Sequence, residues 1–260
     1  MARIAVGVEY EGTDFVGWQS QRNGRSVAQV LSAAVSTVAA ETVEVYGAGR
    51  TDAGVHATGQ VAHFDAAAPR SPRQWLLGIN SNLPADVAVT WVLPVPDDFD
   101  ARRSALARRY RYAIVCSVAK PVLTRRFAWW LREPLDCAAM AEASIAWIGE
   151  HDFSAFRAAN CQSSTPMRRI EALAITRFEQ RVEIEVTANA FLYHMVRNLV
   201  GVLAEIGRGR AAPRWAEELL AGRDRSKAAP TAPSCGLTLV AVRYAAELGL
   251  PAAAERAPPF

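Results

Sequence analysis

Apolar residues in this chain recur with a period of two, then of 3.6, then of two again, and this order of patterns occurs twice. In the first half, alternation over residues 4–10 predicts a strand. Ser26 and Gln29 have the spacing of a capping box, and apolar residues then recur at helical spacing to about Ala40. The other predicted elements of this half are strands over 42–48, 55–64 and 87–93 and a short helix over 71–79.

The second half begins the same order again after a connection at 94–100. Each half resembles a split β-α-β unit, so we predict an α+β protein of two similar ferredoxin-like subdomains whose antiparallel sheets join around a central basic cleft. No fixed-period repeat is visible, so the duplication concerns element order alone. The elements predicted here are strands over 107–116, 170–178, 181–188 and 237–244, and helices over 135–148 (capped by Asp136), 190–206 and 213–222.

The length and composition fit such a two-part globular chain. Its 260 residues are about 1.7 times a ~150-residue domain, and apolar residues make up 51%. We expect a first subdomain over 1–100 and a second, basic subdomain over 101–246. The alanine- and proline-rich residues 247–260 are expected to form a flexible tail.

Several classes of protein are excluded by what the sequence lacks. The longest stretches without a charged residue, 26–40 and 228–242, are 15 residues each, shorter than the ~18 that a membrane-spanning helix needs. Glu9 and Glu11 precede any long apolar run, so no secretory signal is predicted and a cytoplasmic location is expected.

The cysteines and histidines do not form a recognisable metal site or disulfide framework. The four cysteines include no CxxC pair, and the four histidines have neither an HExxH arrangement nor a cysteine partner at zinc-site spacing. Phosphate-loop and hydrolase-elbow motifs are also missing. Any chemistry is therefore expected to use carboxylate, tyrosine or arginine side chains, without a metal.

Charge is distributed unevenly along the chain. Residues 1–100 carry six basic and eleven acidic side chains, whereas residues 101–260 carry 23 and 15. Arginine supplies 27 of the 29 cations and suits contacts with phosphates and bases. A solvated basic strand face is the alternative interpretation of the densest cluster. That cluster comprises Arg102, Arg103, Arg108, Arg109 and Arg111, interleaved with Tyr110 and Tyr112.

Four motifs occur along the chain. They are YEGTDFVGWQ at 10–19, GAGRTDAGVH at 47–56 continuing through Gly59, Gln60 and Val61, RRYRY at 108–112, and Phe191 with HMVRN at 194–198. In this order they resemble the tRNA pseudouridine synthase A family. The motifs span nearly the whole chain, and GRTDAGVH in front of a strand is a specific signature. Glu11 stands where the family usually has Asp, a change that affects no catalytic residue.

The resemblance implies a reaction and its partners. It implies isomerisation of uridine to pseudouridine at positions 38–40 of the tRNA anticodon stem-loop, without a cofactor, by a homodimer. A synthase of the same architecture acting on other uridines is one alternative. A non-catalytic RNA-binding module is another, since basic, aromatic-bearing sheets bind single-stranded RNA without chemistry. The acidic loop tip at Asp52 favours an enzyme over a non-catalytic binding module. In a module that only binds RNA, a negative charge in the binding cleft would repel the RNA phosphates and bring no benefit.

Asp52 is the candidate catalytic carboxylate. It lies in a turn bounded by Gly49 and Gly54, where the backbone can be tight and exposed. The uracil must leave C1′ and rejoin through C5, so the enzyme needs a carboxylate that attacks C1′ or removes a 2′ proton from a flipped-out nucleotide. An aspartate that only serves the turn is the structural alternative.

The resemblance gives further site residues. Tyr110 matches the family's active-site tyrosine, and Arg197 matches the arginine that ion-pairs with the catalytic carboxylate. Arg50 is expected on the same side as Asp52, able to reach the RNA backbone or replace the flipped base.

The RNA contacts expected beyond these residues are less specific. A lone histidine at a helix start more often has a structural role. The helix predicted over 190–206 would place Phe191, His194 and Arg197 on one face. The predicted RNA contacts are Trp18, Arg108, Arg109 and His194, together with Arg50 and Tyr110.

Overall fold

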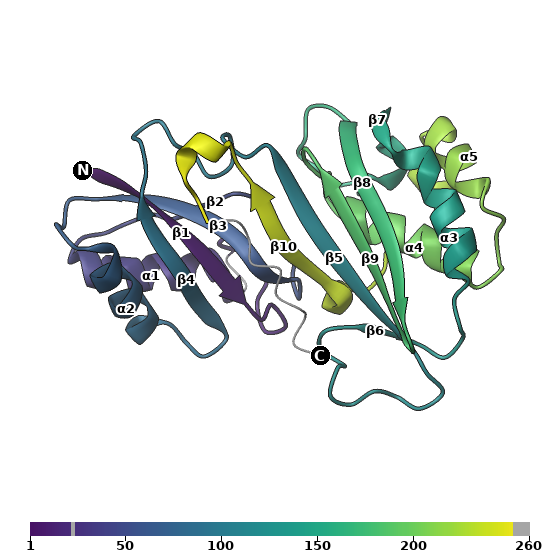
Figure 1. Ribbon diagram of the computed structural model, residues 1–260, viewed down its shortest axis with the longest axis horizontal. Coiled ribbons are helices and arrows are strands. Elements are labelled where there is room, and N and C mark those ends of the chain that lie inside the picture. Colours follow the sequence, from purple (N-terminus) through teal and green to yellow (C-terminus); the bar gives the residue numbers. More distant parts are fainter. Residues whose placement is uncertain (22–23, 252–260) are drawn as a thin grey trace. The chain divides into compact units, whose positions relative to one another are not determined.

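The computed structural model describes residues 1–21 and 24–251 and is a mixed α/β structure of two compact units (Figure 1). The first unit is Met1–Leu106 together with the chain from Thr238 on, and the second is Ala107–Leu237. Among the described residues, no helix combines the length and the apolar character that a membrane span requires.

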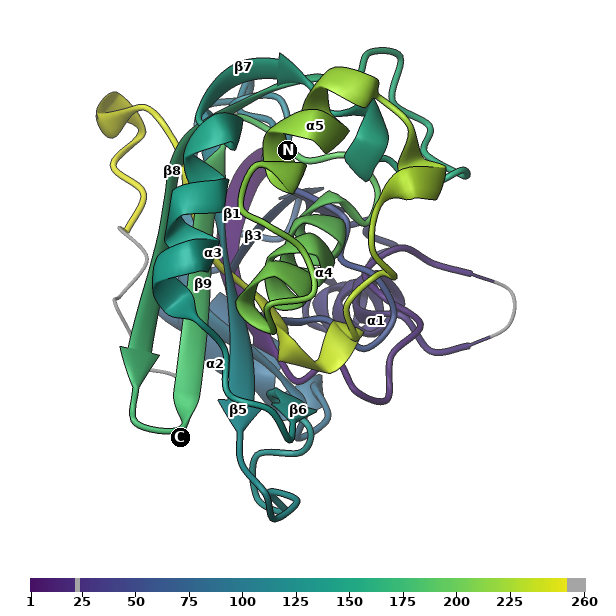
Figure 2. The ribbon, with the colours of Figure 1, turned by 90° about the vertical axis from the view of Figure 1, so that its right-hand side faces the viewer.

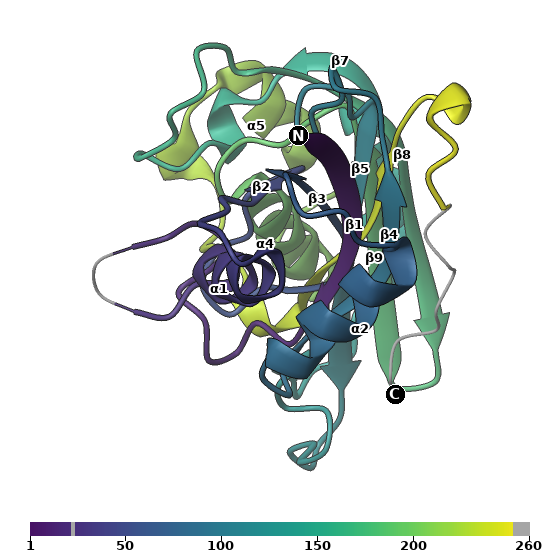
Figure 3. The same ribbon diagram turned by 90° about the vertical axis from the view of Figure 1, so that its left-hand side faces the viewer.

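The first unit is a four-stranded sheet in the order β4–β1–β3–β10, with the short β2 added to β3. Helices α1 and α2 pack against each other (Figure 3). Both start at a serine whose side chain accepts the N–H of a glutamine three residues later, which confirms the capping box predicted at Ser26 and reveals a second one at Ser71. The elements are β1 Ala2–Tyr10, α1 Val27–Ala39, β2 Tyr46–Gly47, β3 His56–Ala66, α2 Pro72–Asn82, β4 Val87–Pro94 and β10 Leu237–Arg243.

The second unit is a sheet in the order β5–β9–β8–β7, with β6 beside β5. Helices α3 and α4 pack together, and both lie on the same side of β8 and β9 (Figure 2). Asp136 accepts two backbone N–H groups at the start of α3, as predicted. The elements are β5 Ala107–Cys116, β6 Trp129–Leu131, α3 Cys137–Ser144, β7 Gly149–Asp152, β8 Met167–Phe178, β9 Arg181–Ala188, α4 Met195–Gly207 and α5 Trp215–Gly222.

Short 3-10 helices complete the described chain. They are η1 Ile145–Trp147, η2 Ser154–Phe156, η3 Arg225–Lys227, η4 Ser234–Gly236 and η5 Ala246–Leu248. The last of these lies at the start of the segment predicted to be a flexible tail, and residues 252–260 of that segment lie outside the described residues.

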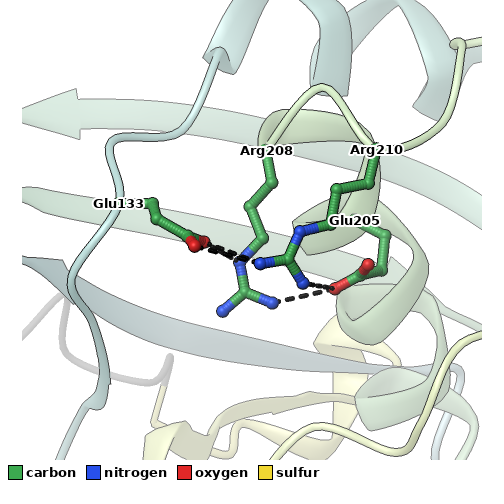
Figure 4. A network of polar contacts seen from close by, with 4 residues as sticks. All are labelled: Glu133, Glu205, Arg208 and Arg210. Carbon is green, nitrogen blue, oxygen red and sulfur yellow. Dashed lines mark hydrogen bonds and ion pairs between the residues drawn. The ribbon is translucent and has the colours of Figure 1, made fainter.

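A network of charged side chains anchors the end of α4 (Figure 4). Arg208 lies 2.9 Å from Glu133 and 2.8 Å from Glu205, and Arg210 lies 3.0 Å from Glu133. Cations at a helix C-terminus also interact favourably with the helix dipole. The network therefore ties α4 to the segment that follows β6.

Three predicted elements differ markedly in extent from the structure, beyond small shifts at the ends of the others. The strand predicted over 42–48 is reduced to β2, because the N–H groups of Val43 and Val45 are bound by Ser36 and Ser32 of α1. The helix predicted from 190 begins at Met195, because His194 has φ 60°, which breaks a right-handed helix. The helix predicted over 135–148 changes to 3-10 geometry after Ser144.

The prediction of wholly antiparallel sheets is wrong for two strand pairs. Strand β10 is parallel to β3, with Thr238 opposite His56, and β6 is parallel to β5. Sequence order placed the final strand in the second subdomain, but its partner β3 is in the first unit. Gly59 permits this approach, since a Cβ there would lie 2.1 Å from the Val240 carbonyl oxygen. Strands β6 and β7 were not predicted.

Candidate active site

The loop that carries Asp52 is clamped by the segment that follows β1. Asp52 forms an isolated antiparallel bridge with Gly17, and the Trp18 N–H donates to the Thr51 carbonyl at 3.0 Å. On the other side of the bridge, the Gly54 N–H donates to the Phe15 carbonyl at 3.3 Å. The first two sequence motifs thus form one structural feature, in which the segment after β1 holds the Asp52 loop in place.

Two glycines make this clamp possible. Gly17 has φ 111°, in the region that L side chains avoid, and a Cβ there would lie 2.5 Å from the Thr51 carbonyl oxygen. At Gly12 a Cβ would lie 1.9 Å from the Val55 carbonyl oxygen. A side chain at either position would push the Asp52 loop away.

Buried polar groups support the loop from below. The Tyr10 hydroxyl lies 2.7 Å from Thr51 Oγ1, and Gln60 Nε2 donates to the Gly49 carbonyl at 2.9 Å. Burial raises the pKa of Tyr10 well above its ordinary range, more than its hydrogen bonds with Thr51 and Gln60 lower it, so the hydroxyl stays neutral. His56 Nδ1 accepts the Gly12 N–H at 3.0 Å.

These supporting residues were not predicted as part of the site. His56, Gln60, Thr51 and Tyr10 all lie inside the two quoted motifs, and all are less than 9% exposed. The available signal was their polar character within or next to otherwise apolar strand patterns, since a polar side chain is buried only with a hydrogen-bonding partner.

Around Asp52, side chains alternate between the core and solvent. Thr51 is buried at 6% exposure, whereas Arg50 is exposed and Asp52 is half-buried. This pattern is the one expected of an extended segment with Arg50 and Asp52 on the side away from the core. The loop therefore presents a carboxylate and a guanidinium two residues apart.

Trp18 lies in the core and not on the surface. It is 5% exposed, its ring centroid is 6.1 Å from that of Tyr10, and a Cβ on Gly47 would lie 2.4 Å from the indole. The predicted role in lining the RNA path does not fit this burial. Trp18 instead supports the Asp52 loop through its packing and its backbone N–H.

In the second unit, Tyr110 is 8% exposed on β5, and its ring meets Phe191 edge-on at 5.2 Å between centroids. Tyr112 is fully buried on the same strand face, and its hydroxyl donates to the Pro233 carbonyl at 2.7 Å. Burial and this hydrogen bond favour a structural role for Tyr112, and Tyr110 is the more accessible of the two tyrosines.

The strand arginines have contacts within the protein. Arg108 Nη1 donates to the Asn189 carbonyl at 2.9 Å, and Arg111 Nε donates to Glu185 at 2.7 Å. Arg109 is half-buried, and its Nε has no hydrogen-bond partner among the described residues. By contrast, Arg102 and Arg103 are exposed, and their backbone N–H groups are both held by the Asp100 carboxylate.

Arg197 lies in the first turn of α4, where its Nε donates to the Ala232 carbonyl at 2.7 Å. His194 precedes the helix, with its ring stacked on Tyr193 at 3.9 Å. Phe191, His194 and Arg197 therefore do not share a helix face as predicted, because only Arg197 belongs to α4. Asp52 lies in the first unit, and Tyr110 and Arg197 lie in the second.

A carboxylate held on a clamped loop, beside an arginine, can act as a nucleophile or a base. The chain matches a family profile described as tRNA pseudouridine synthase over residues 6–102 and 143–245.

Curated relatives match nearly the whole chain, and each is named tRNA pseudouridine synthase A. One from Alcanivorax borkumensis is 50% identical over 252 residues, covering 96% of this chain and 94% of the relative. Those from Klebsiella pneumoniae and Vibrio cholerae are 48% and 49% identical, each over 96% of this chain and over 93% and 94% of the relative. The chain belongs to the tRNA pseudouridine synthases, the isomerases that convert uridine in tRNA to pseudouridine.

Similarity to solved structures is much weaker. A crystal structure of the archaeal box H/ACA sRNP Nop10–Cbf5 complex is 10% identical, with a TM-score of 0.37 over 77% of this chain and 44% of that chain. This similarity carries no inference about the present chain.

Proposed function

We propose that this protein converts uridine to pseudouridine at positions 38–40 of the tRNA anticodon stem-loop, with Asp52 as the catalytic carboxylate. The observation that carries the proposal is the clamped loop, which holds a half-buried aspartate beside an exposed arginine. A loop fixed by this many backbone contacts keeps its carboxylate in one position, which is what a group acting on a flipped nucleotide needs.

The reaction is balanced within one nucleotide. The bond between N1 and C1′ breaks, a bond between C5 and C1′ forms, C5 loses a proton and N1 gains one. Asp52 can begin this sequence by attacking C1′ or by removing the 2′ proton, and both routes use the same ionised carboxylate. Neither route consumes a cofactor.

The other side chains have supporting roles in this proposal. Arg197 binds the Asp52 carboxylate and keeps it oriented. Arg197 Nε already donates to the Ala232 carbonyl. The guanidinium would therefore bind the two oxygens of the Asp52 carboxylate through its two terminal nitrogens. Tyr110 contacts the extruded uracil, and Arg50 contacts the RNA backbone or takes the place of the flipped base.

We further infer that the basic residues after Asp100 bind RNA phosphates, in agreement with the positive charge of residues 101–260. Family resemblance supports a homodimer that holds one tRNA, and a cytoplasmic location where tRNA is found. The two units are interpreted as related ferredoxin-like subdomains, each containing a mixed sheet and at least two helices.

The Asp52→Asn variant tests the proposal directly. It keeps the size and polarity of the side chain but removes its charge, so tRNA binding should persist while tritium release from C5-tritiated uridine in a tRNA transcript falls by at least about 10³-fold. Asp98→Asn, at an exposed aspartate of the same unit, is the matched control and should retain full activity. Substantial pseudouridine formation by Asp52→Asn would show that Asp52 is not the catalytic carboxylate.

A further inference from the structure

A segment without helix or strand structure lies against the N-terminal half of α4. Residues 229–233, here called the strap, connect η3 to η4. A Cβ on Gly201 of α4 would lie only 2.2 Å from the Pro230 carbonyl oxygen, and Ala232 is 1% exposed. Because its backbone is partly buried, the polar groups of the strap need partners.

Arg197 supplies two of these partners, its backbone carbonyl and its side chain. The Ala232 N–H donates to the Arg197 carbonyl at 3.1 Å, and Arg197 Nε donates to the Ala232 carbonyl at 2.7 Å. Since Nε–H lies in the plane of the guanidinium group, this second bond fixes the orientation of that plane. The strap thus holds both the backbone and the side chain of Arg197.

The fully buried side-chain amide of Asn198 holds the strap in place. Asn198 Oδ1 accepts Thr231 Oγ1 at 2.7 Å and Arg225 Nη2 at 3.0 Å, while its Nδ2 donates to the Phe156 carbonyl at 2.8 Å. Arg225 also donates to the Ala229 carbonyl at 3.0 Å. These donors and acceptors fix the orientation of the Asn198 amide, so the network has one arrangement.

The far end of the strap is held from β5. The Tyr112 hydroxyl donates to the Pro233 carbonyl at 2.7 Å. Burial raises the pKa of Tyr112 well above its ordinary range, so this hydroxyl remains a donor at neutral pH. Thr231 and Tyr112 therefore restrain the strap on both sides of Ala232.

We propose that Tyr112, Asn198 and Thr231 are positioning residues, which set the plane of the Arg197 guanidinium through the Ala232 carbonyl. The inference rests on the proposed function, in which Arg197 holds the Asp52 carboxylate. The three residues act on the rate because a small rotation of the guanidinium spoils a two-point grip on a carboxylate.

Two near-isosteric variants, Thr231→Val and Tyr112→Phe, test the proposal independently of each other. Each should lower the single-turnover rate on an unmodified tRNA transcript by about tenfold while leaving the Kd for that transcript unchanged. In an Arg197→Lys background, Thr231→Val should cost less than about twofold, because the group that it positions is gone. Ser144→Ala, which removes a buried hydrogen bond to the Ala141 carbonyl in α3, is the control and should lower only the Tm.

Three outcomes would overturn the proposal. The first is that both variants behave like Ser144→Ala, with a lower Tm and an unchanged rate. The second is an equal loss of rate in the wild-type and Arg197→Lys backgrounds, which would show that the strap acts elsewhere. The third is a near wild-type rate for Arg197→Lys, which would remove Arg197 from the site and the positioning role with it. Asp52→Asn would still report separately on the reaction.

Discussion

At the scale of single residues, the buried polar side chains distinguish this site from an ordinary turn. Asp52 itself is only half-buried, but the groups beneath it are satisfied by hydrogen bonds in the core: Tyr10 with Thr51, Gln60 with Gly49, and His56 with Gly12. These hydrogen bonds fix the backbone of the loop that carries Asp52, as the proposed catalytic role requires.

The proposed pairing of Asp52 with Arg197 gives a prediction at the same scale. Arg197→Lys keeps the charge but cannot reproduce the planar two-point contact, so its rate should fall by roughly 10²-fold with normal folding and tRNA binding. The double variant Asp52→Ala/Arg197→Ala should be little slower than Asp52→Ala alone, because the two groups act as a unit. Single-turnover kinetics measure both effects.

Arg214→Lys serves as the control for the Arg197 substitution. Arg214 precedes α5, and its side chain is 81% exposed, so the same exchange there should change neither rate nor stability. Additive losses in the double variant would contradict the pairing of Asp52 with Arg197.

At the scale of elements, the clamp between the loop after β1 and the Asp52 loop carries the site. It depends on a close backbone approach at Gly17, where the chain has φ 111° and a Cβ would lie 2.5 Å from the Thr51 carbonyl oxygen. A backbone atom cannot move aside as a flexible side chain would. The geometry of one loop is therefore set by a glycine in the other.

Gly17→Ala should consequently lower both stability and activity. The positive φ and the close contact together should cost about 2 kcal/mol in the free energy of unfolding. The rate should fall further than this loss of stability explains, because the Asp52 loop has to shift. Urea unfolding and single-turnover rates check the two effects. Gly222→Ala, with open space around its Cβ, is the control, and equal behaviour of both variants would refute the clamp.

At the scale of the whole molecule, the uneven charge predicts how tRNA binding responds to salt. Arg102 and Arg103 are exposed, whereas Arg108 is bonded to Asn189 and Arg109 is half-buried. Each phosphate contact contributes about −0.9 to the logarithmic salt slope for a duplex and about −0.7 for a single strand. Arg102 and Arg103 should therefore contribute more to the salt slope than Arg108 and Arg109 do.

Replacing Arg102 and Arg103 with alanine should flatten the salt slope by about 1.4 to 1.8, with the fold intact. The corresponding change at Arg108 and Arg109 should alter the slope less and lower the Tm more, because both side chains are half-buried and Arg108 donates to the Asn189 carbonyl. Filter binding at several salt concentrations measures the slope. No change in the Arg102/Arg103 variant would show that RNA phosphates bind elsewhere.

The sequence alone determined the features that depend on local interactions. The serine caps of α1 and α2, the aspartate cap of α3 and the extended β5 follow from residues within a few positions of each other. The Asp52 motif was equally visible, because a glycine-bounded turn is a local feature. Resemblance to a family then added the reaction.

The tertiary structure decided what depends on distant partners. Alternation predicted a final strand but not its parallel partner β3, since the period of two reports which face is buried and not which strand lies alongside. The burial of Trp18, the left-handed His194 that delays α4, and the strap across Arg197 likewise come from contacts between segments far apart in the chain. Local propensity is weak compared with such packing, so only the folded chain reveals how the Asp52 loop and Arg197 are held in place.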